Sequence, residues 1–401
     1  MSRYRFIILA LLLIMISCES MTQEEREVLP GIYSTVDYID LLQGKKVGVV
    51  ANQASIINNT HLVDTLSLLG IDLRAIYCPE HGFRGDAEAG AMISSYIDPI
   101  TSLPIVSLYG NNKKPNLDEF ANNDIIIFDL QDVGTRFYTY ISTLHYVMEA
   151  SAELDIPIIV LDRPNPNAHY VDGPVLKDPK LVSFVGLHPV PIVYGMTIGE
   201  YAKMINGEKW LGTSAKRVAG EKGSLRCELS VIPIQNYNHN TPYSLPIPPS
   251  PNLRTDRAIC LYPSLCWFEG SPVSVGRGTD HPFEIIGFPE YKSAANNILE
   301  FTPRRIKGVS ENPPHRGVLC RGYRLDCDSN ISSSIDLSHL IEMYNSHPQK
   351  QSFFWAFFDK LSGDRNLKLM IKEGRTEEEI KASWANDLEK FRKIREKYLI
   401  Y

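Results

Sequence analysis

The sequence predicts an α/β protein in which a Rossmann-like parallel sheet domain is followed by a smaller α+β domain. Apolar runs that alternate with segments of helical period favour strands buried on both faces, which is typical of a parallel sheet covered by helices. The five runs cover residues 47–51, 73–78, 105–108, 124–130 and 156–161. Beyond about residue 200 the chain becomes proline-rich, tyrosine-rich and less regular. We therefore expect a sheet domain over residues 31–205 and an α+β domain over 206–401.

The first 18 residues are typical of a secretory signal. Two arginines precede an apolar stretch, residues 6–16, which is short for a bilayer span, and Ser17 and Cys18 follow at once. A small residue before a cysteine resembles a bacterial lipoprotein box, so we expect lipidation of Cys18, with plain cleavage of the signal as the alternative. Residues 19–30 would then tether an exported, periplasmic or outer-membrane lipoprotein to the membrane surface.

Helices are expected between the strands and at the end of the chain. The first covers residues 62–69, and the second, over about 138–154, has a clear apolar face. In the second domain, alternating stretches at 229–234 and 317–325 predict strands, and residues 377–398 predict an amphipathic helix. The proline-rich segment 242–251 is expected to be a rigid linker or an ordered loop over the site.

Polar residues follow each of the five predicted strands. In open parallel sheets, ligands bind outside the carboxyl ends of the strands, so these residues are expected to share one edge. They are Asn52 and Gln53; Glu80 and His81; Tyr109; Asp129, Gln131 and Asp132; and Asp162, Arg163 and Asn165. Glu80 is the leading catalytic candidate. For any single Asp or Asn, capping of the next helix or shaping of a turn is the alternative.

Composition and missing motifs exclude several functions. The net charge of -6 and the absence of basic runs argue against nucleic acid as a partner. The sequence has no Gly-x-Ser-x-Gly elbow, His-Glu-x-x-His, Walker loop or early Gly-x-Gly-x-x-Gly. Carboxylates, aromatic rings and arginines at loop positions are typical of a carbohydrate-active site, which needs no cofactor.

The cysteines give no metal-clip spacing. Pairing of Cys320 with Cys327, or of Cys260 with Cys266, is possible in an exported protein, but buried free thiols are expected for most of them.

Eight motifs, in order along the chain, resemble the family of exo-β-N-acetylmuramidases of the NamZ type. They are PEHG at 79–82, DLQDVGTRFYTYI at 129–141, LDRPNPN at 161–167, VDGP at 171–174, YGMTIGE at 194–200, PSPNL at 249–253, FEG at 268–270 and GRGT at 276–279. The resemblance covers nearly the whole mature chain. It implies two domains, one of them Rossmann-like, and release of terminal N-acetylmuramic acid from the non-reducing ends of peptidoglycan fragments. Members of this family are exported and serve cell-wall turnover and recycling.

One position departs from the family pattern. Where the family usually has Ser-Glu-Gly-Arg-Gly-Thr, this chain has Val275 in place of the glutamate. If the glutamate contacts substrate, specificity or rate differs here. If it only braces Arg277, Glu269 or Glu284 takes its place.

The acid–base roles follow from the chemistry of glycoside cleavage. Glu80 is expected to protonate the glycosidic oxygen, which requires a raised pKa, and His81 to tune it or hold the sugar. A second carboxylate is needed unless the acetamido group of the substrate attacks. We favour Asp132, with Asp129 and Glu269 as the other options; Asp129 and Glu269 otherwise bind substrate, as do Asn52, Gln131 and Arg163.

Arginines and aromatic rings are the other candidates for substrate contact. Arg136 and Arg277 are expected to pair with the lactyl carboxylate of N-acetylmuramic acid, or else to bridge the domains through Asp or Glu. Of Tyr138 and Tyr140, one is expected to stack on a sugar and the other to pack in the core. Trp267 and Phe268 form an aromatic wall or, more often for such a pair, are buried.

Two other functions stay open. One is a metal-assisted esterase or amidase acting on wall fragments, with Asp129, Asp132, Asp162 and His81 as candidate ligands. The other is a lipoprotein that binds muropeptides without turnover, which the Val275 departure suggests. The substrate in each case is a peptidoglycan-derived muropeptide or disaccharide.

Overall fold

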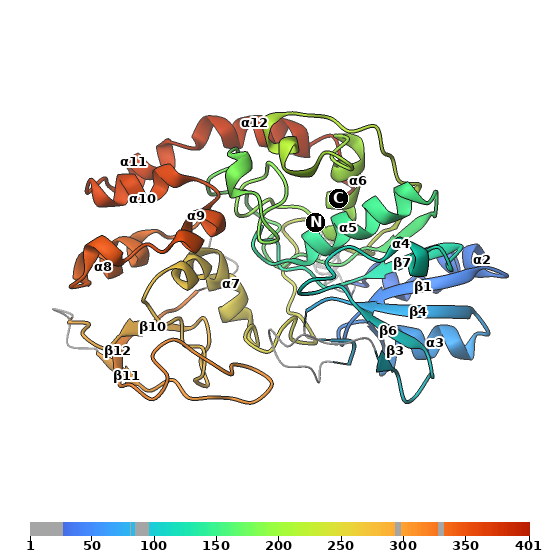
Figure 1. The fold of residues 1–401 in the computed structure, drawn as a ribbon, viewed down its shortest axis with the longest axis horizontal. Coiled ribbons are helices and arrows are strands. Elements are labelled where there is room, and N and C mark those ends of the chain that lie inside the picture. The colour runs from blue at the N-terminus through green and yellow to red at the C-terminus, as the bar shows by residue number, and fades with distance from the viewer. Residues whose placement is uncertain (1–26, 81, 85–95, 293–297, 328–332) are drawn as a thin grey trace, which may run out of the picture.

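The computed structural model describes residues 27–80, 82–84, 96–292, 298–327 and 333–401. Two halves of the chain lie side by side (Figure 1), a sheet half coloured blue to green and a second half coloured yellow to red. The signal segment with Cys18, most of the tether and His81 lie outside the described residues. No helix in the described ranges has the length and apolar run that a bilayer crossing requires.

The sheet half contains seven strands in the order β5-β6-β4-β1-β7-β8-β9. In chain order they are β1 (Lys46–Ala51), β4 (Asp72–Cys78), β5 (Tyr96–Ile97), β6 (Pro104–Ser107), β7 (Ile125–Asp129), β8 (Ile158–Leu161) and β9 (Leu229–Ile232). All neighbours pair in parallel except β5 with β6. The chain builds outward from β1 to β6, then returns to build β7 to β9 on the other side. The order of strands thus reverses between β1 and β7, the place where Rossmann-like sheets bind ligands.

Both faces of this sheet are covered, as predicted. One core packs Val50 and Phe128 against α5 (Tyr140–Glu153) and α6 (Ile198–Gly207). Their neighbours Val49 and Ile127 point to the opposite face, which α2 (Thr35–Leu42) and α3 (Leu62–Leu68) cover. Alternate residues of each strand therefore enter different cores, which explains why the strands are apolar throughout. A short hairpin, β2 (Ile56–Ile57) with β3 (Thr60–His61), and α4 (Leu117–Phe120) complete this half.

The second half combines helices with a small antiparallel sheet, as the α+β prediction requires. The sheet has the order β10-β12-β11, and its strands are β10 (Ile285–Phe288), β11 (Leu299–Phe301) and β12 (Cys320–Arg324). The helices are α7 (Asp256–Leu265), α8 (Ser338–Ser346), α9 (Ala356–Ser362), α10 (Arg365–Lys372), α11 (Glu377–Ala382) and α12 (Ala385–Arg395). The expected helix over 377–398 is thus two helices, and the second reaches back over the sheet half (Figure 1).

The predicted domain boundary at residues 205/206 is wrong. It falls inside α6, and β9 pairs in parallel with β8, so the sheet extends to residue 232. The sequence misplaced β9 because it is an edge strand with half-exposed side chains, and its pattern alternates as in an antiparallel sheet.

Neither of the two cysteine pairings considered possible from the sequence is formed. Cys260 on α7 is bonded to Cys327, 67 residues away, which lies just beyond β12. Four other cysteines are buried free thiols, as expected for most of them: Cys78, Cys227, Cys266 and Cys320.

Candidate active site

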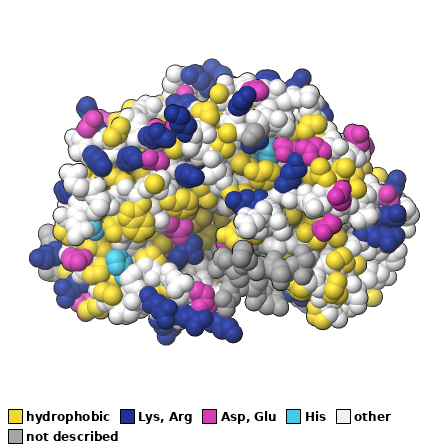
Figure 2. Space-filling view, in the orientation of Figure 1, with side chains coloured by type: hydrophobic (Ala, Val, Ile, Leu, Met, Phe, Trp, Pro, Cys, Tyr) yellow, Lys and Arg dark blue, Asp and Glu magenta, His cyan; other side chains and the backbone are white. Residues whose placement is uncertain are grey.

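A cavity of about 410 Å³ lies where the two halves meet. Figure 2 shows the hollow near the middle of the molecule. Its wall consists of Glu80, Tyr109, Gly110, Lys113, Phe137, Tyr138, Thr139, Tyr140, Phe184, Val185, Ser250, Asn252, Leu253, Tyr262, Glu269, Arg277 and Phe283. Its volume lies within the range of small-molecule sites, and aromatic rings dominate its lining.

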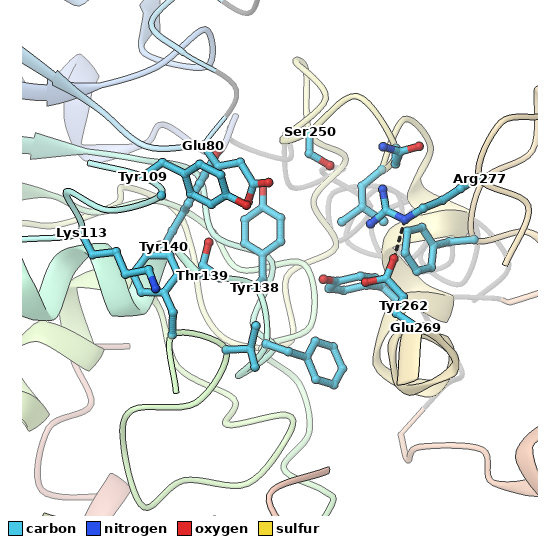
Figure 3. A pocket seen from close by; sticks show the side chains of 17 residues that line it. Glu80, Tyr109, Lys113, Tyr138, Thr139, Tyr140, Ser250, Tyr262, Glu269 and Arg277 are labelled. Atoms are coloured by element: carbon cyan, nitrogen blue, oxygen red, sulfur yellow. Dashed lines mark hydrogen bonds and ion pairs between the residues drawn. The ribbon is translucent and has the colours of Figure 1, made fainter. Parts of the chain in front are cut away.

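Glu80 and Tyr109 bring the carboxyl ends of two neighbouring strands to this cavity. Glu80 follows β4 and Tyr109 follows β6, and these strands pair in parallel. The hydroxyl of Tyr109 donates a hydrogen bond to the carboxylate of Glu80. Burial, and then the charge of Glu80, raise the pKa of Tyr109, which therefore stays a protonated donor. Figure 3 shows the two side chains together on one side of the cavity.

Tyr138 and Tyr140 continue the same wall just before and at the start of α5. Their rings meet edge to face with centroids 4.7 Å apart. The Tyr138 hydroxyl donates to the carbonyl of Pro249 at 2.8 Å, and the Tyr140 hydroxyl accepts from Nδ2 of Asn52 at 2.9 Å. Both tyrosines line the cavity, so they do not divide between site and core as expected. Asn52, at the end of β1, is buried behind Tyr140 and holds it rather than reaching the cavity.

Glu269 and Arg277 face the cavity from the second half. Nε of Arg277 donates to Oε1 of Glu269, and the guanidinium lies 5.1 Å from the centre of the Phe283 ring. The dashed line in Figure 3 marks this pair, opposite Glu80. Among the described residues, the cavity therefore holds one carboxylate on each side.

The Val275 departure can be placed on this wall. Val275 is only 2% exposed and packs in the apolar core. Of the two carboxylates expected to replace the missing glutamate as a brace for Arg277, Glu269 makes that contact. Glu284 instead accepts from Thr255 and Arg324.

Trp267 and Phe268 are fully buried beside Glu269. They take the core role that was the more frequent alternative and do not form an aromatic wall.

Asp132 is buried behind the wall and does not line the cavity. Its Oδ2 accepts from the amide of Gly134 at 2.8 Å and from the hydroxyl of Tyr194. Burial raises the pKa of Asp132 to about 6 against the lowering effect of these bonds. Gly134 has a positive φ of 77°, and its backbone amide holds the Asp132 carboxylate in this buried position.

Three more predicted site residues are locked into the sheet edge. Asp129 and Arg163 form a buried bidentate pair, with Nε to Oδ1 at 2.6 Å and Nη2 to Oδ2 at 2.8 Å. Gln131 donates to the carbonyls of Asp132 and Pro164. None of the three lines the cavity, so the structure gives them a role in shaping loops. In the described part of the chain, no group of three or more His, Cys, Asp or Glu side chains is arranged to hold a metal ion.

The prediction that Arg136 binds a substrate carboxylate is wrong. Its side chain is fully buried away from the cavity. Nη1 donates to the carbonyls of Pro174 and Val190, and Nη2 to those of Leu361 and Ser362. Burial lowers the pKa of Arg136 to about 10, which still leaves a cation at neutral pH. Arg136 bridges the two halves, as the alternative held, but through backbone carbonyls rather than Asp or Glu.

The sequence reasoning missed several residues of the wall. Lys113 lies a few residues beyond the end of β6, and extending the strand-end rule along that loop would have found it. No strand-end signal marks four other residues of the wall: Tyr262 on α7, Phe283 before β10, Ser250 near the end of the proline-rich segment, and Asn252 just beyond it. They come from the second half, where no regular strand order points to an edge. Of the proline-rich segment, Ser250 lines the cavity and the carbonyl of Pro249 accepts a hydrogen bond from Tyr138, whereas residues 242–244 line a separate pocket.

Comparison with known proteins gives matches over most of the chain. The model "Exo-beta-N-acetylmuramidase NamZ, N-terminal" matches residues 47–257, and the model of the C-terminal part of the same family matches 260–401. The peptidoglycan beta-N-acetylmuramidase NamZ of Bacillus subtilis is 38% identical over 404 residues, covering 96% of this chain and 94% of that protein.

Two crystal structures of DUF1343 family proteins from Bacteroides fragilis share the fold. One has a TM-score of 0.83 at 44% identity and covers 94% of this chain and 99% of its own. The other has a TM-score of 0.75 at 26% identity and covers 93% and 99%.

Proposed function

Because this chain belongs to the family of NamZ exo-β-N-acetylmuramidases, we propose that its cavity cleaves terminal β-linked N-acetylmuramic acid from the non-reducing ends of peptidoglycan fragments. The chain is a glycoside hydrolase of peptidoglycan muropeptides. The observation that carries the proposal for the site is Glu80, a carboxyl group at a strand end that lines a small aromatic cavity and accepts a hydrogen bond from Tyr109. Release of one sugar at a time suits a role in cell-wall turnover and recycling.

Glu80 is proposed as the general acid. A carboxylic acid at this place protonates the glycosidic oxygen as the bond breaks and the sugar gains oxocarbenium character. The faces of Tyr138 and Tyr140 suit the apolar faces of a pyranose ring, since aromatic side chains combine a large apolar surface with a polar tip. Tyr109 fixes the direction of the Glu80 carboxyl group.

Glu269 is proposed as the second carboxylate. Of the three options from the sequence, Asp132 and Asp129 lie behind the wall, and only Glu269 shares the cavity with Glu80. Its ion pair with Arg277 fixes its position. Arg277 thereby orients Glu269 and presents its remaining N–H groups to sugar hydroxyls.

A chromogenic β-N-acetylmuraminide tests this function directly. The mature wild-type protein should release the chromophore, and Glu80→Gln should lose about 10²–10⁴-fold in kcat with an unchanged Tm, because the amide cannot donate an acidic proton. Activity should persist in a chelator. A folded wild type that releases no chromophore overturns the proposed function, whereas full activity of Glu80→Gln overturns only the assignment of the acid.

We also propose that the protein is exported and anchored through a lipid on Cys18, at the periplasmic or outer-membrane surface. The support is the sequence of residues 1–18, with its basic start, apolar stretch and Ser17-Cys18 junction. Mass spectrometry of the N-terminal peptide from the membrane fraction should show a diacylglyceryl cysteine. Cys18→Ala should move the protein out of that fraction; an unmodified Cys18 in mature protein would refute the anchor.

A further inference from the structure

We infer that Lys113 recognises the lactyl carboxylate of the terminal sugar and so selects N-acetylmuramic acid over N-acetylglucosamine. The inference rests on the proposed function, since it concerns the same cavity and the same substrate. The two sugars differ by the lactyl ether, whose carboxylate is the only anionic group of a muramic residue that carries no peptide stem; the inference concerns that stem-free form. A residue that discriminates between them must therefore offer a positive charge at the cavity wall.

The charges of the cavity wall point to Lys113. Among the described residues, four charged side chains line it, and two of them, Glu269 and Arg277, neutralise each other in an ion pair. Glu80 has to be protonated and uncharged when it acts as the acid. The charge that is left on this wall is the ammonium group of Lys113, so the site carries an excess of one positive charge in its reactive state. An anionic substrate restores the balance.

The surroundings of Lys113 position its ammonium group at the cavity and do not neutralise its charge. Nζ lies 5.1 Å from the centre of the Phe184 ring, a cation–π contact that positions the charge. Both residues line the cavity, and Lys113 is only half exposed. Within the described ranges no carboxylate lies within ion-pair distance of Lys113. A partly desolvated cation gains from an anionic partner, and the substrate supplies one.

The next residue in the sequence shows the contrast. Nζ of Lys114 lies 3.1 Å from Glu149 and 2.7 Å from Glu153, both on α5, and Lys114 does not line the cavity. Two adjacent lysines thus differ in their partners, one paired with protein carboxylates and the other directed to the site. Figure 3 shows Lys113 on the same side of the cavity as Glu80 and Tyr140.

The two arginines expected to bind this carboxylate are less suited to it. Arg136 is buried and donates to four carbonyls. Arg277 reaches the cavity, but a second carboxylate beside it would lie next to the negative charge of Glu269. The two neighbouring negative charges would repel each other, which reduces the binding free energy that the Arg277 guanidinium could contribute.

Matched substrates and matched lysines test the inference. Lys113→Met removes the charge and keeps the length of the side chain, and Lys114→Met is the control on the neighbouring residue. We measure kcat/KM for the chromogenic β-N-acetylmuraminide and for its methyl ester, in which the lactyl carboxylate is neutral. A charge-assisted hydrogen bond of about 1.5–3 kcal/mol corresponds to roughly 10- to 150-fold. Lys113→Met should therefore lose about 10- to 150-fold on the free acid and less than about threefold on the ester, where wild type and variant should become nearly equal.

The controls separate recognition from folding. Lys114→Met should stay within about twofold of wild type on both substrates, and Lys113→Arg should recover most of the lost activity because it keeps the charge. The Tm of each variant reports folding. Equal losses of Lys113→Met on acid and ester, or no loss on either, overturn the inference. So does an Arg277→Met variant that removes the preference for the acid while Lys113→Met keeps it. Failure of the proposed function shows differently, as a wild type inactive on the free acid.

Discussion

The two walls of the cavity use polar residues in different ways. At the sheet edge, most polar side chains bind one another behind a layer of tyrosines: Asp129 holds Arg163, Gln131 holds two carbonyls, and Asp132 binds Tyr194. The second half places one pair, Glu269 with Arg277, directly on the cavity surface. The comparison shows that most polar residues at the strand ends stabilise the loops rather than contact a ligand. We call the buried residues Asp129, Gln131, Asp132 and Arg163 the locked layer; at the sheet edge, only Glu80 and Tyr109 extend beyond it into the cavity.

Substitution of Glu269, in the pair with Arg277 on the cavity surface, should have the largest effect on turnover. Glu269→Gln keeps the size of the side chain and removes the second carboxylate, so kcat for the muraminide should fall about 10²–10⁴-fold. The free energy of unfolding should change little, since a partly exposed ion pair contributes about 1 kcal/mol or less. A variant with full kcat would show that the second half only shapes the cavity.

Substitution in the locked layer should have the opposite effect, lowering stability strongly and changing kcat little. Asp129→Ala leaves the buried guanidinium of Arg163 without its partner, and such a loss costs about 3–5 kcal/mol. Urea unfolding should show this, while the kcat measured for the folded fraction at low temperature should remain within about threefold of wild type. Loss of kcat without loss of stability would place Asp129 in the reaction and contradict the contrast between the walls.

The pH dependence of stability tests whether Asp132 belongs to the locked layer or to the reaction. Its folded pKa of about 6 lies above the ordinary value near 3.9, so between these values the folded protein keeps a proton that the unfolded chain has lost. Stability from this group is therefore present below about pH 4 and is lost as the pH rises through 6, by about 3 kcal/mol. Asp132→Asn removes this dependence.

The measurement is the difference in unfolding free energy between wild type and Asp132→Asn at pH 4 and pH 7. Using the difference cancels the similar shift of Asp162, whose pKa burial also raises to about 6. The variant should gain relative to wild type at pH 7, and its turnover rate should stay within a few fold. If turnover instead slowed by about 10²-fold or more, the size of effect expected for loss of an acid or base, Asp132 would be restored as a catalytic residue.

Tyr109 gives the smallest effect and sharpens the role of Glu80. Tyr109→Phe keeps the ring and removes the hydroxyl that orients the Glu80 carboxyl group, so kcat/KM should fall about tenfold, the value of one charge-assisted hydrogen bond. Tyr146→Phe, on α5 but outside the cavity, is the control and should have no such effect. An unchanged Tyr109→Phe would mean that Glu80 is positioned by its backbone alone.

The central fold could be predicted from sequence because its strands are buried on both faces. Continuous apolar runs mark β1, β4, β6, β7 and β8, and each was expected within a few residues of its bounds. The edge strand β9 was not recognised as part of this sheet, because its side chains are half exposed and its apolar and polar residues alternate. The pairing of Cys260 with Cys327 depends on how β12 reaches α7 in space, which spacing along the chain does not encode.

The site could be predicted only in part, for a related reason. Strand order brings polar residues to one edge, and this rule led to Glu80. It does not tell whether a side chain turns outward, as Glu80 does, or inward, as Asp132 and Arg163 do. That choice depends on partners from distant segments, such as Tyr194 for Asp132. Lys113 stood outside the motifs and several residues beyond the end of β6, so the strand-end rule, applied to the residues directly after each strand, did not reach it.

The buried guanidinium of Arg136 has a consequence for motion. Two of the carbonyls that accept hydrogen bonds from Arg136 belong to the sheet half and two to α9 of the second half. A rotation of one half against the other would break some of these bonds and leave the guanidinium buried without acceptors. Such a cation costs several kcal/mol, which opposes hinge bending. We therefore expect the width of the cleft to stay nearly constant during turnover, so that sugars enter and leave without a hinge motion of the two halves.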